Sequence, residues 1–118
     1  MGLFGKKKEK EKPQEEPTIR EEYENVYVNI TEKMLRVELE EDRGFARYIN
    51  IKENGDRIQI ISDGIIIAEI GKRGKAYKEI EPFVGYGAES VVIEAKTGEY
   101  GDYYRLRMKI HTGTVVTN

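Results

Sequence analysis

The chain has 118 residues, no cysteine and a net charge of −2, with 36% of its residues charged. This length suits one domain, and the lack of cysteine excludes disulfide bridges and thiolate metal sites. The nearly balanced charge excludes a general basic field, so any binding of nucleic acid must depend on a local patch.

The N-terminal segment is rich in Lys, Glu, Gln and Pro from Lys6 to Glu22. Such a composition buries too little apolar surface to offset the entropy lost when the backbone becomes ordered. We therefore expect residues 1–22 to form a disordered charged tail and residues 23–118 to form a single β-rich domain. The longest apolar run, Ile65 to Ala68, is far below the roughly 20 residues that span a bilayer. This predicts a soluble, cytoplasmic protein without a membrane partner.

After the tail, apolar and polar residues alternate with a period of two, which is typical of strands with one buried face. The first three predicted strands carry the faces Val26, Val28 and Ile30; Leu35, Val37 and Leu39; and Phe45, Arg47, Ile49 and Ile51. The pair Asn54-Gly55 tolerates positive φ at both central turn positions, so it predicts a hairpin leading into a strand over residues 57–62.

The second half of the chain contains the most apolar predicted strand and the single predicted helix. Ile65 to Ile70 is apolar on both faces for most of its length, which predicts a central strand after a turn at Asp63-Gly64. Apolar residues then recur three or four positions apart from Lys75 to Phe83, which predicts a short helix; they are Ala76, Tyr77, Ile80 and Phe83.

A closing hairpin is predicted from two further alternating runs, Val91–Lys96 and Tyr103–His111. Six or seven short strands with one helix favour a compact barrel over an open α/β layer. The fold class is therefore predicted to be mainly β, a β-barrel or a strongly bent antiparallel sheet with one short α-helix.

One face of the last predicted strand is basic and aromatic. Its residues are Tyr103, Arg105, Arg107, Lys109 and His111. Cations about 7 Å apart match the phosphate spacing of an extended single strand, and a tyrosine ring can stack on any base. The face could equally be a solvated one, on which these cations pair with Glu94 or with other acids of a neighbouring strand.

A second basic cluster lies between the central strand and the helix. It consists of Lys72, Arg73, Lys75, Tyr77 and Lys78. Backbone amides at a glycine-containing turn before a helix attract phosphate or carboxylate, and nearby cations strengthen that attraction. A solvated turn without a ligand explains the same residues.

The sequence offers no conventional catalytic centre. His111 is the single histidine, and the two serines, Ser62 and Ser90, show no triad-like spacing to it. An acidic cluster, Glu38, Glu40, Glu41 and Asp42, is more typical of a charged strand end than of a site for a hard cation. We therefore expect no enzyme activity, no cofactor and no metal.

The stretch from Asn54 to Ile80 resembles the middle of a HIRAN domain, a small β-barrel module found alone in bacteria and attached to DNA-remodelling enzymes in eukaryotes. The residues that carry the resemblance are Asn54, Asp56, Ile58, Ile60, Asp63, Gly64, Ile67, Ile70 and Ala76. The resemblance implies binding of single-stranded DNA or of DNA ends, without catalysis by the domain itself.

These observations favour a non-enzymatic module that binds single-stranded nucleic acid or DNA ends. The expected binding residues are Lys72, Arg73, Lys75, Tyr77, Lys78, Tyr103, Arg105, Arg107 and Lys109. The alternative is a protein-interaction or self-associating module that adds a strand along an exposed edge such as Tyr23 to Ile30.

Overall fold

The computed structural model describes residues 16–118, which are built mainly from β-strands. Its elements in chain order are β2 (Thr18–Ile30), the 3₁₀ helix η2 (Glu32–Met34), β3 (Arg43–Phe45), β4 (Ile49–Asn54), β5 (Arg57–Ser62), β6 (Ile65–Gly71), α1 (Lys75–Ile80), the 3₁₀ helix η3 (Glu81–Phe83), β7 (Gly87–Gly98) and β8 (Gly101–Thr117).

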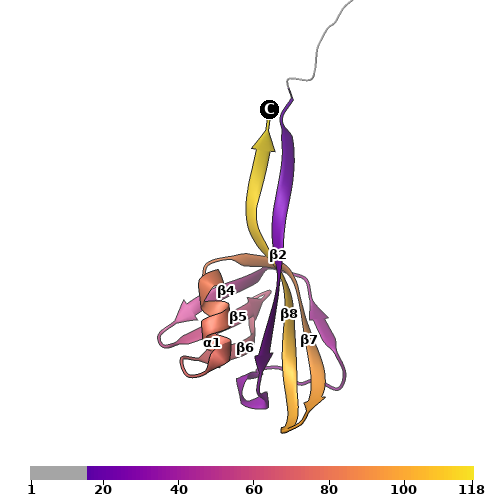
Figure 1. Cartoon of the computed structure of the whole chain (residues 1–118), viewed down its shortest axis with the longest axis vertical. Helices are drawn as coiled ribbons and strands as arrows, with labels where there is room; N and C mark the ends of the chain where they lie inside the picture. The colour runs from indigo at the N-terminus through magenta and orange to yellow at the C-terminus, as the bar shows by residue number, and fades with distance from the viewer. Residues whose placement is uncertain (1–15) are drawn as a thin grey trace, which may run out of the picture.

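The strands form one antiparallel sheet of seven strands in the order β2-β8-β7-β4-β5-β6, with β3 paired to β7. The helix α1 contacts both β2 and β6, although these strands lie at opposite ends of that order. The sheet is therefore strongly bent, and α1 lies at the gap between its two ends (Figure 1). No ladder joins β2 to β6 among residues 16–118, so the predicted fold class is confirmed as an open, bent sheet with one short helix.

The core lies on the concave side of this sheet. Alternate side chains of β2, Val26, Val28 and Ile30, are at most 8% exposed, as the period-two pattern predicts. They pack in one cluster with Ile residues of β4, β5 and β6, with alternate residues of β7 and β8, and with α1. The predicted helix is confirmed over Lys75–Ile80, and it continues as η3 to Phe83.

The strand β6 occupies a different place from the predicted one. It lies at an end of the strand order rather than at the centre. Ile67, Ala68 and Ile70 are nevertheless fully buried, because α1 contacts β6 and the segment after η2 pairs with it through the Leu35–Ala68 bridge, whereas Ile65 at the start of the strand is 60% exposed. Cover from a helix and a loop thus produces the same apolar pattern as a central strand.

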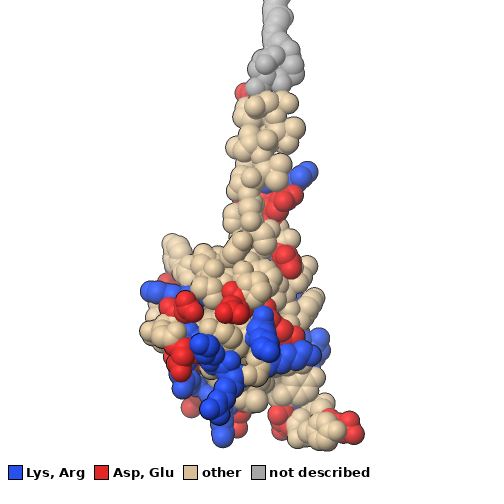
Figure 2. All heavy atoms as spheres, turned by 60° about the vertical axis from the view of Figure 1, so that its left-hand side comes forward, with Lys and Arg blue, Asp and Glu red and all other residues tan. Residues whose placement is uncertain are grey.

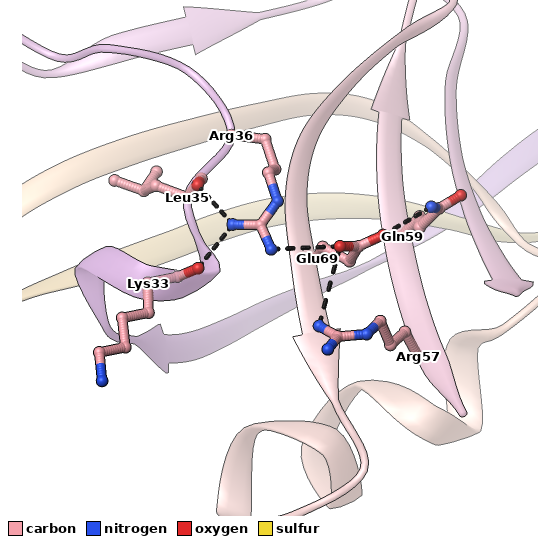
Figure 3. Close-up of polar contacts among 6 residues, drawn as sticks. All are labelled: Lys33, Leu35, Arg36, Arg57, Gln59 and Glu69. Atoms are coloured by element: carbon pink, nitrogen blue, oxygen red, sulfur yellow. Dashed lines mark hydrogen bonds and ion pairs between the residues drawn. The ribbon is translucent and has the colours of Figure 1, made fainter. Parts of the chain in front are cut away.

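The segment after η2 is a loop held against β6, not the strand predicted from Leu35, Val37 and Leu39. The Arg36 amide donates to the carbonyl of Ile67, and the Arg36 guanidinium donates to the carbonyls of Lys33 and Leu35 and to the carboxylate of Glu69 (Figure 3). The loop therefore covers the edge that β6 would otherwise expose.

The third predicted strand is also interrupted. Tyr48 has a φ of 48°, in the left-handed region, and separates β3 from β4. Arg47 is therefore exposed and does not continue the face of Ile49 and Ile51. The following hairpin is confirmed, because β4 pairs with β5 across a turn in which Gly55 has a φ of 67°.

Two strands extend well beyond the body of the fold. Residues 18–22 of β2 pair with residues 113–117 of β8 as a two-stranded ribbon, which we call the arm (Figure 1). Residues 18–22, which belong to the predicted tail, are therefore part of the strand β2 in the structure. Residues 1–15 of the predicted tail lie outside the described residues.

Candidate functional site

The basic face predicted for the last strand exists on β8. Leu106, Met108 and Ile110 are fully buried. The intervening Arg107 is exposed and Lys109 half-buried, so these cations lie on the opposite, outer face of the strand. The alternation of the sequence is enough to predict this orientation.

The register of β2 adds aromatic and amide side chains to the same face. Tyr27 pairs with Arg107, Asn29 with Arg105, and Tyr23 with His111, and directly opposed residues of an antiparallel pair share a face. We call this surface the platform; it comprises Tyr23, Asn25, Tyr27 and Asn29 of β2, Tyr103, Arg105, Arg107, Lys109 and His111 of β8, and Glu94 and Lys96 of β7.

The four β2 residues of the platform were not predicted from the sequence. Burial of Val26 and Val28 already implied that Tyr27 points outward. The missing information was the pairing of β2 with β8, which joins positions about eighty residues apart and leaves no local signal.

The platform carries more cations than acids. Glu94 lies 3.6 Å from Arg105 Nε, 3.4 Å from Arg107 Nε and 3.8 Å from Lys96 Nζ, while Lys109 Nζ lies 3.2 Å from Glu89. Four cations thus share two carboxylates. The pairing with Glu94 that would describe a solvated face is present, but it leaves an excess of positive charge on this surface.

A hollow of about 360 Å³ joins the platform to α1. Its lining comes from three elements and comprises Tyr27, Asn29, Lys75, Glu79, Tyr103 and Arg105. One residue of the second predicted cluster, Lys75 of α1, therefore meets Tyr103 and Arg105 of β8 at this hollow. It combines two tyrosine rings, one amide and two cations with the carboxylate of Glu79 at its wall.

Arg105 is weakly held within the protein. Its Nε atom is buried without a hydrogen bond among the described residues, and the Glu94 oxygen nearest to it is 3.6 Å away. Lys75 makes no ion pair with any of residues 16–118. The buried Nε of Arg105 is not accessible to a ligand. The donors that this hollow offers to an anionic ligand therefore come from Lys75 and from the rest of the Arg105 side chain, which is 37% exposed.

Other members of the predicted second cluster lie elsewhere. Lys72 and Arg73 line a different hollow with Asp56, Arg57 and Gly71. Lys78 is exposed on α1 but is not among the residues that line the hollow of Tyr27 and Tyr103. Only Lys75 of this cluster therefore joins the platform.

The structure does not support the predicted role of Tyr77 as a binding residue. It is 6% exposed and packs in the core with Ala76 and Ile80, so its ring is not accessible for stacking on a base. Burial raises the pKa of its phenol, and the nearby carboxylates of Glu81 and Glu53 raise it further. Its position in the apolar repeat of the helix was the signal that it faces inward.

Charged side chains of both signs cover the body of the molecule. Figure 2 shows Lys and Arg grouped on the body with Asp and Glu among them, whereas the arm carries few charges on the face shown. The excess of cations on the platform is therefore a local feature, as the net charge of −2 requires.

His111 and Ser62 make hydrogen bonds within the fold. His111 Nε2 pairs with a carboxylate oxygen of Glu21, and its ring meets Tyr23 edge to face at 5.4 Å. The hydrogen bond from His111 lowers the pKa of Glu21, and a second bond from Thr114 adds to this effect. Ser62 is buried, and its hydroxyl donates to the Arg47 carbonyl at 2.9 Å.

The described chain has neither a clustered metal-ligand set nor a bilayer-spanning helix. No three His, Asp or Glu side chains of residues 16–118 gather as a metal site requires. No helix in this range has the length and hydrophobicity to cross a bilayer. Comparison of the chain with protein-family models, with curated proteins and with solved structures finds no match. The function is therefore inferred from the site.

Proposed function

We propose that this protein is a non-enzymatic module that binds single-stranded nucleic acid across the platform. The observation that carries the proposal is the hollow in which Tyr27, Tyr103, Arg105 and Lys75 meet. An aromatic ring beside a free cation is the combination that single-strand binders use, because every base has a face for stacking and every nucleotide has a phosphate.

The arrangement of the platform suits an extended strand. Arg105, Arg107 and Lys109 follow one another at alternate positions of β8, about 7 Å apart, which matches successive phosphates. On the neighbouring strand β2, Tyr27 offers a ring that is 52% exposed, and Asn25 and Asn29 offer amides that can hydrogen-bond to base edges. A backbone following β8 could therefore place its bases over β2.

The resemblance of residues 54–80 to HIRAN domains supports the same class of ligand. It implies single-stranded DNA or DNA ends, whereas the platform chemistry does not distinguish DNA from RNA. Because phosphate contacts dominate such binding, the affinity should fall steeply with salt.

Titration of a fluorescently labelled single-stranded oligonucleotide, as DNA and as RNA, at several salt concentrations tests the proposal. The double variant Lys75→Ala/Arg105→Ala removes two cations from the hollow and should lower the affinity by about tenfold or more. Lys72→Ala/Arg73→Ala is the matched control, since it removes two cations that line a different hollow. Absence of binding by the unaltered protein at low salt, or equal loss in both variants, contradicts the proposal.

A further inference from the structure

The arm is a two-stranded ribbon with one free edge on each side. Ile19 pairs with Val116 and Arg20 with Val115, while the ladder between β7 and β8 ends at Ala88 and Ile110. Beyond that pair, no strand of residues 16–118 lies against the second edge of β8. The ribbon projects away from the body of the fold (Figure 1).

A ribbon of this kind is poorly stabilised on its own. Two strands without a third strand or a packed face are at best marginally stable in water. Ile19 and Val116 lie opposite each other and are 64% and 57% exposed, so this apolar pair of the arm is largely open to solvent. An additional strand would satisfy the free backbone groups of the edge and extend the sheet.

The two edges of the arm differ in charge. Residues 112–117 of β8 are Thr, Gly, Thr, Val, Val and Thr, without a charge or a proline. The β2 strand carries Arg20, Glu21 and Glu22, and Arg20 pairs with Glu22 at 3.2 Å. Charged residues protect an edge against strand addition, so the β8 edge is the open one.

We propose that the β8 edge of the arm pairs antiparallel with the same edge of a second copy of this chain. The uncharged segment is complementary to itself, because a two-fold axis through it brings no like charges together. In the resulting four-stranded order β2-β8-β8-β2, the strands with Arg20, Glu21 and Glu22 lie outermost. Their charges oppose further addition, so assembly stops at a closed dimer.

The two-fold axis of an antiparallel pair stands perpendicular to the sheet, so equivalent faces of the two copies lie on the same side. Ile19 and Val116 share one face of the arm because they are directly opposed. The dimer therefore places these side chains of both copies on the same side of a four-stranded sheet. This inference is independent of nucleic-acid binding.

Sedimentation of the unaltered protein and single-cysteine cross-linking test the proposal. The chain has no cysteine, so each introduced thiol is unique. A residue on the two-fold axis opposes its own copy at about 4.5–5.5 Å between Cα atoms, within the range of a disulfide. One of Thr114→Cys, Val115→Cys and Val116→Cys should therefore form a cross-linked dimer on mild oxidation. Arg20→Cys, opposite Val115 on the outer strand, should not.

A charge placed on the β8 edge provides a second measurement. Val115→Lys should shift the protein from dimer to monomer without changing the thermal unfolding of the body, whereas Arg20→Ala should remain dimeric. A monomeric unaltered protein at micromolar concentration would overturn the proposal. So would a dimer that survives in Val115→Lys, a cross-link through Arg20→Cys, or the failure of all three β8 cysteines to cross-link.

Discussion

Arg107 Nε lies 3.4 Å from the carboxylate of Glu94, and that same carboxylate also faces Arg105 at 3.6 Å. One acid of β7 therefore restrains two guanidinium groups of β8. Glu94 is 17% exposed, so its charge is partly shielded from solvent and acts on both cations at close range.

Glu94→Gln should increase the affinity for single-stranded nucleic acid. The substitution keeps the size of the side chain but removes the charge that competes with phosphate for Arg105 and Arg107. An exposed ion pair contributes about 0.2–1 kcal/mol, so we expect an increase of about 1.4- to fivefold at low salt. Oligonucleotide titration measures this increase. Glu99→Gln, in the turn between β7 and β8, is the control and should change little. A loss of affinity in Glu94→Gln would count against binding on the platform.

Tyr27→Ala should weaken binding without unfolding the protein. The ring is 52% exposed and lines the hollow with Tyr103, so its removal deletes a stacking surface but little of the core. Loss of one stacked base costs about 1–3 kcal/mol in affinity. Tyr100→Ala is the matched control, because Tyr100 is 98% exposed and lies at the tip of the β7–β8 turn. Equal binding by the two variants would exclude Tyr27 as a stacking residue.

The alternation of β2, β7 and β8 made their buried faces predictable, because one face of each strand packs on the core. A different pattern, the apolar run from Ile65 to Ile70, misplaced β6 at the centre of the sheet, because Ile67 and Ile70 are buried by α1 and the loop at Leu35 rather than between two strands. Alternation also predicted a strand where the structure has the loop around Val37. Leu35, Val37 and Leu39 alternate with polar residues, but they do not pair as a continuous strand. Alternation reports burial, not hydrogen-bond partners.

The candidate site was partly predictable for a related reason. The cations of β8 follow from the sequence, but the neighbours Tyr27 and Asn29 depend on the register of two distant strands. The arm was missed because Arg20, Glu21 and Glu22 continue the composition of the charged segment before them. Only pairing with residues 113–117 distinguishes these residues from a tail.

Acid should destabilise the fold through Glu69. Its carboxylate accepts a hydrogen bond from the buried Gln59 at 2.8 Å and a second from Arg36 at 3.1 Å (Figure 3). The bond from Gln59 is the main cause that holds the pKa of Glu69 below its ordinary value of 4.5, against the opposing effect of burial. A lowered pKa gives stability that is complete above about pH 4.5 and is lost as the pH falls through the pKa of the folded state.

The variant Glu69→Gln removes this titration. It should be less stable than the unaltered protein at pH 7, and the difference should shrink as the pH falls below about 4.5. Urea unfolding at neutral and acid pH measures the difference. Glu99→Gln, an exposed turn residue, should follow the unaltered protein at every pH. A constant difference between Glu69→Gln and the unaltered protein across the range would show that this carboxylate is not linked to folding.

Leu106 and Arg107, adjacent on β8, should respond to substitution in opposite ways. Leu106 is fully buried, so Leu106→Ala leaves a cavity in the core and should lower the free energy of unfolding by about 2–5 kcal/mol. Arg107 is exposed, so Arg107→Ala should change stability by no more than about 0.5 kcal/mol and should instead weaken oligonucleotide binding. Urea unfolding and oligonucleotide titration of both variants separate the two effects. If Arg107→Ala destabilises the fold as much as Leu106→Ala does, the outer face of β8 serves the structure rather than a ligand.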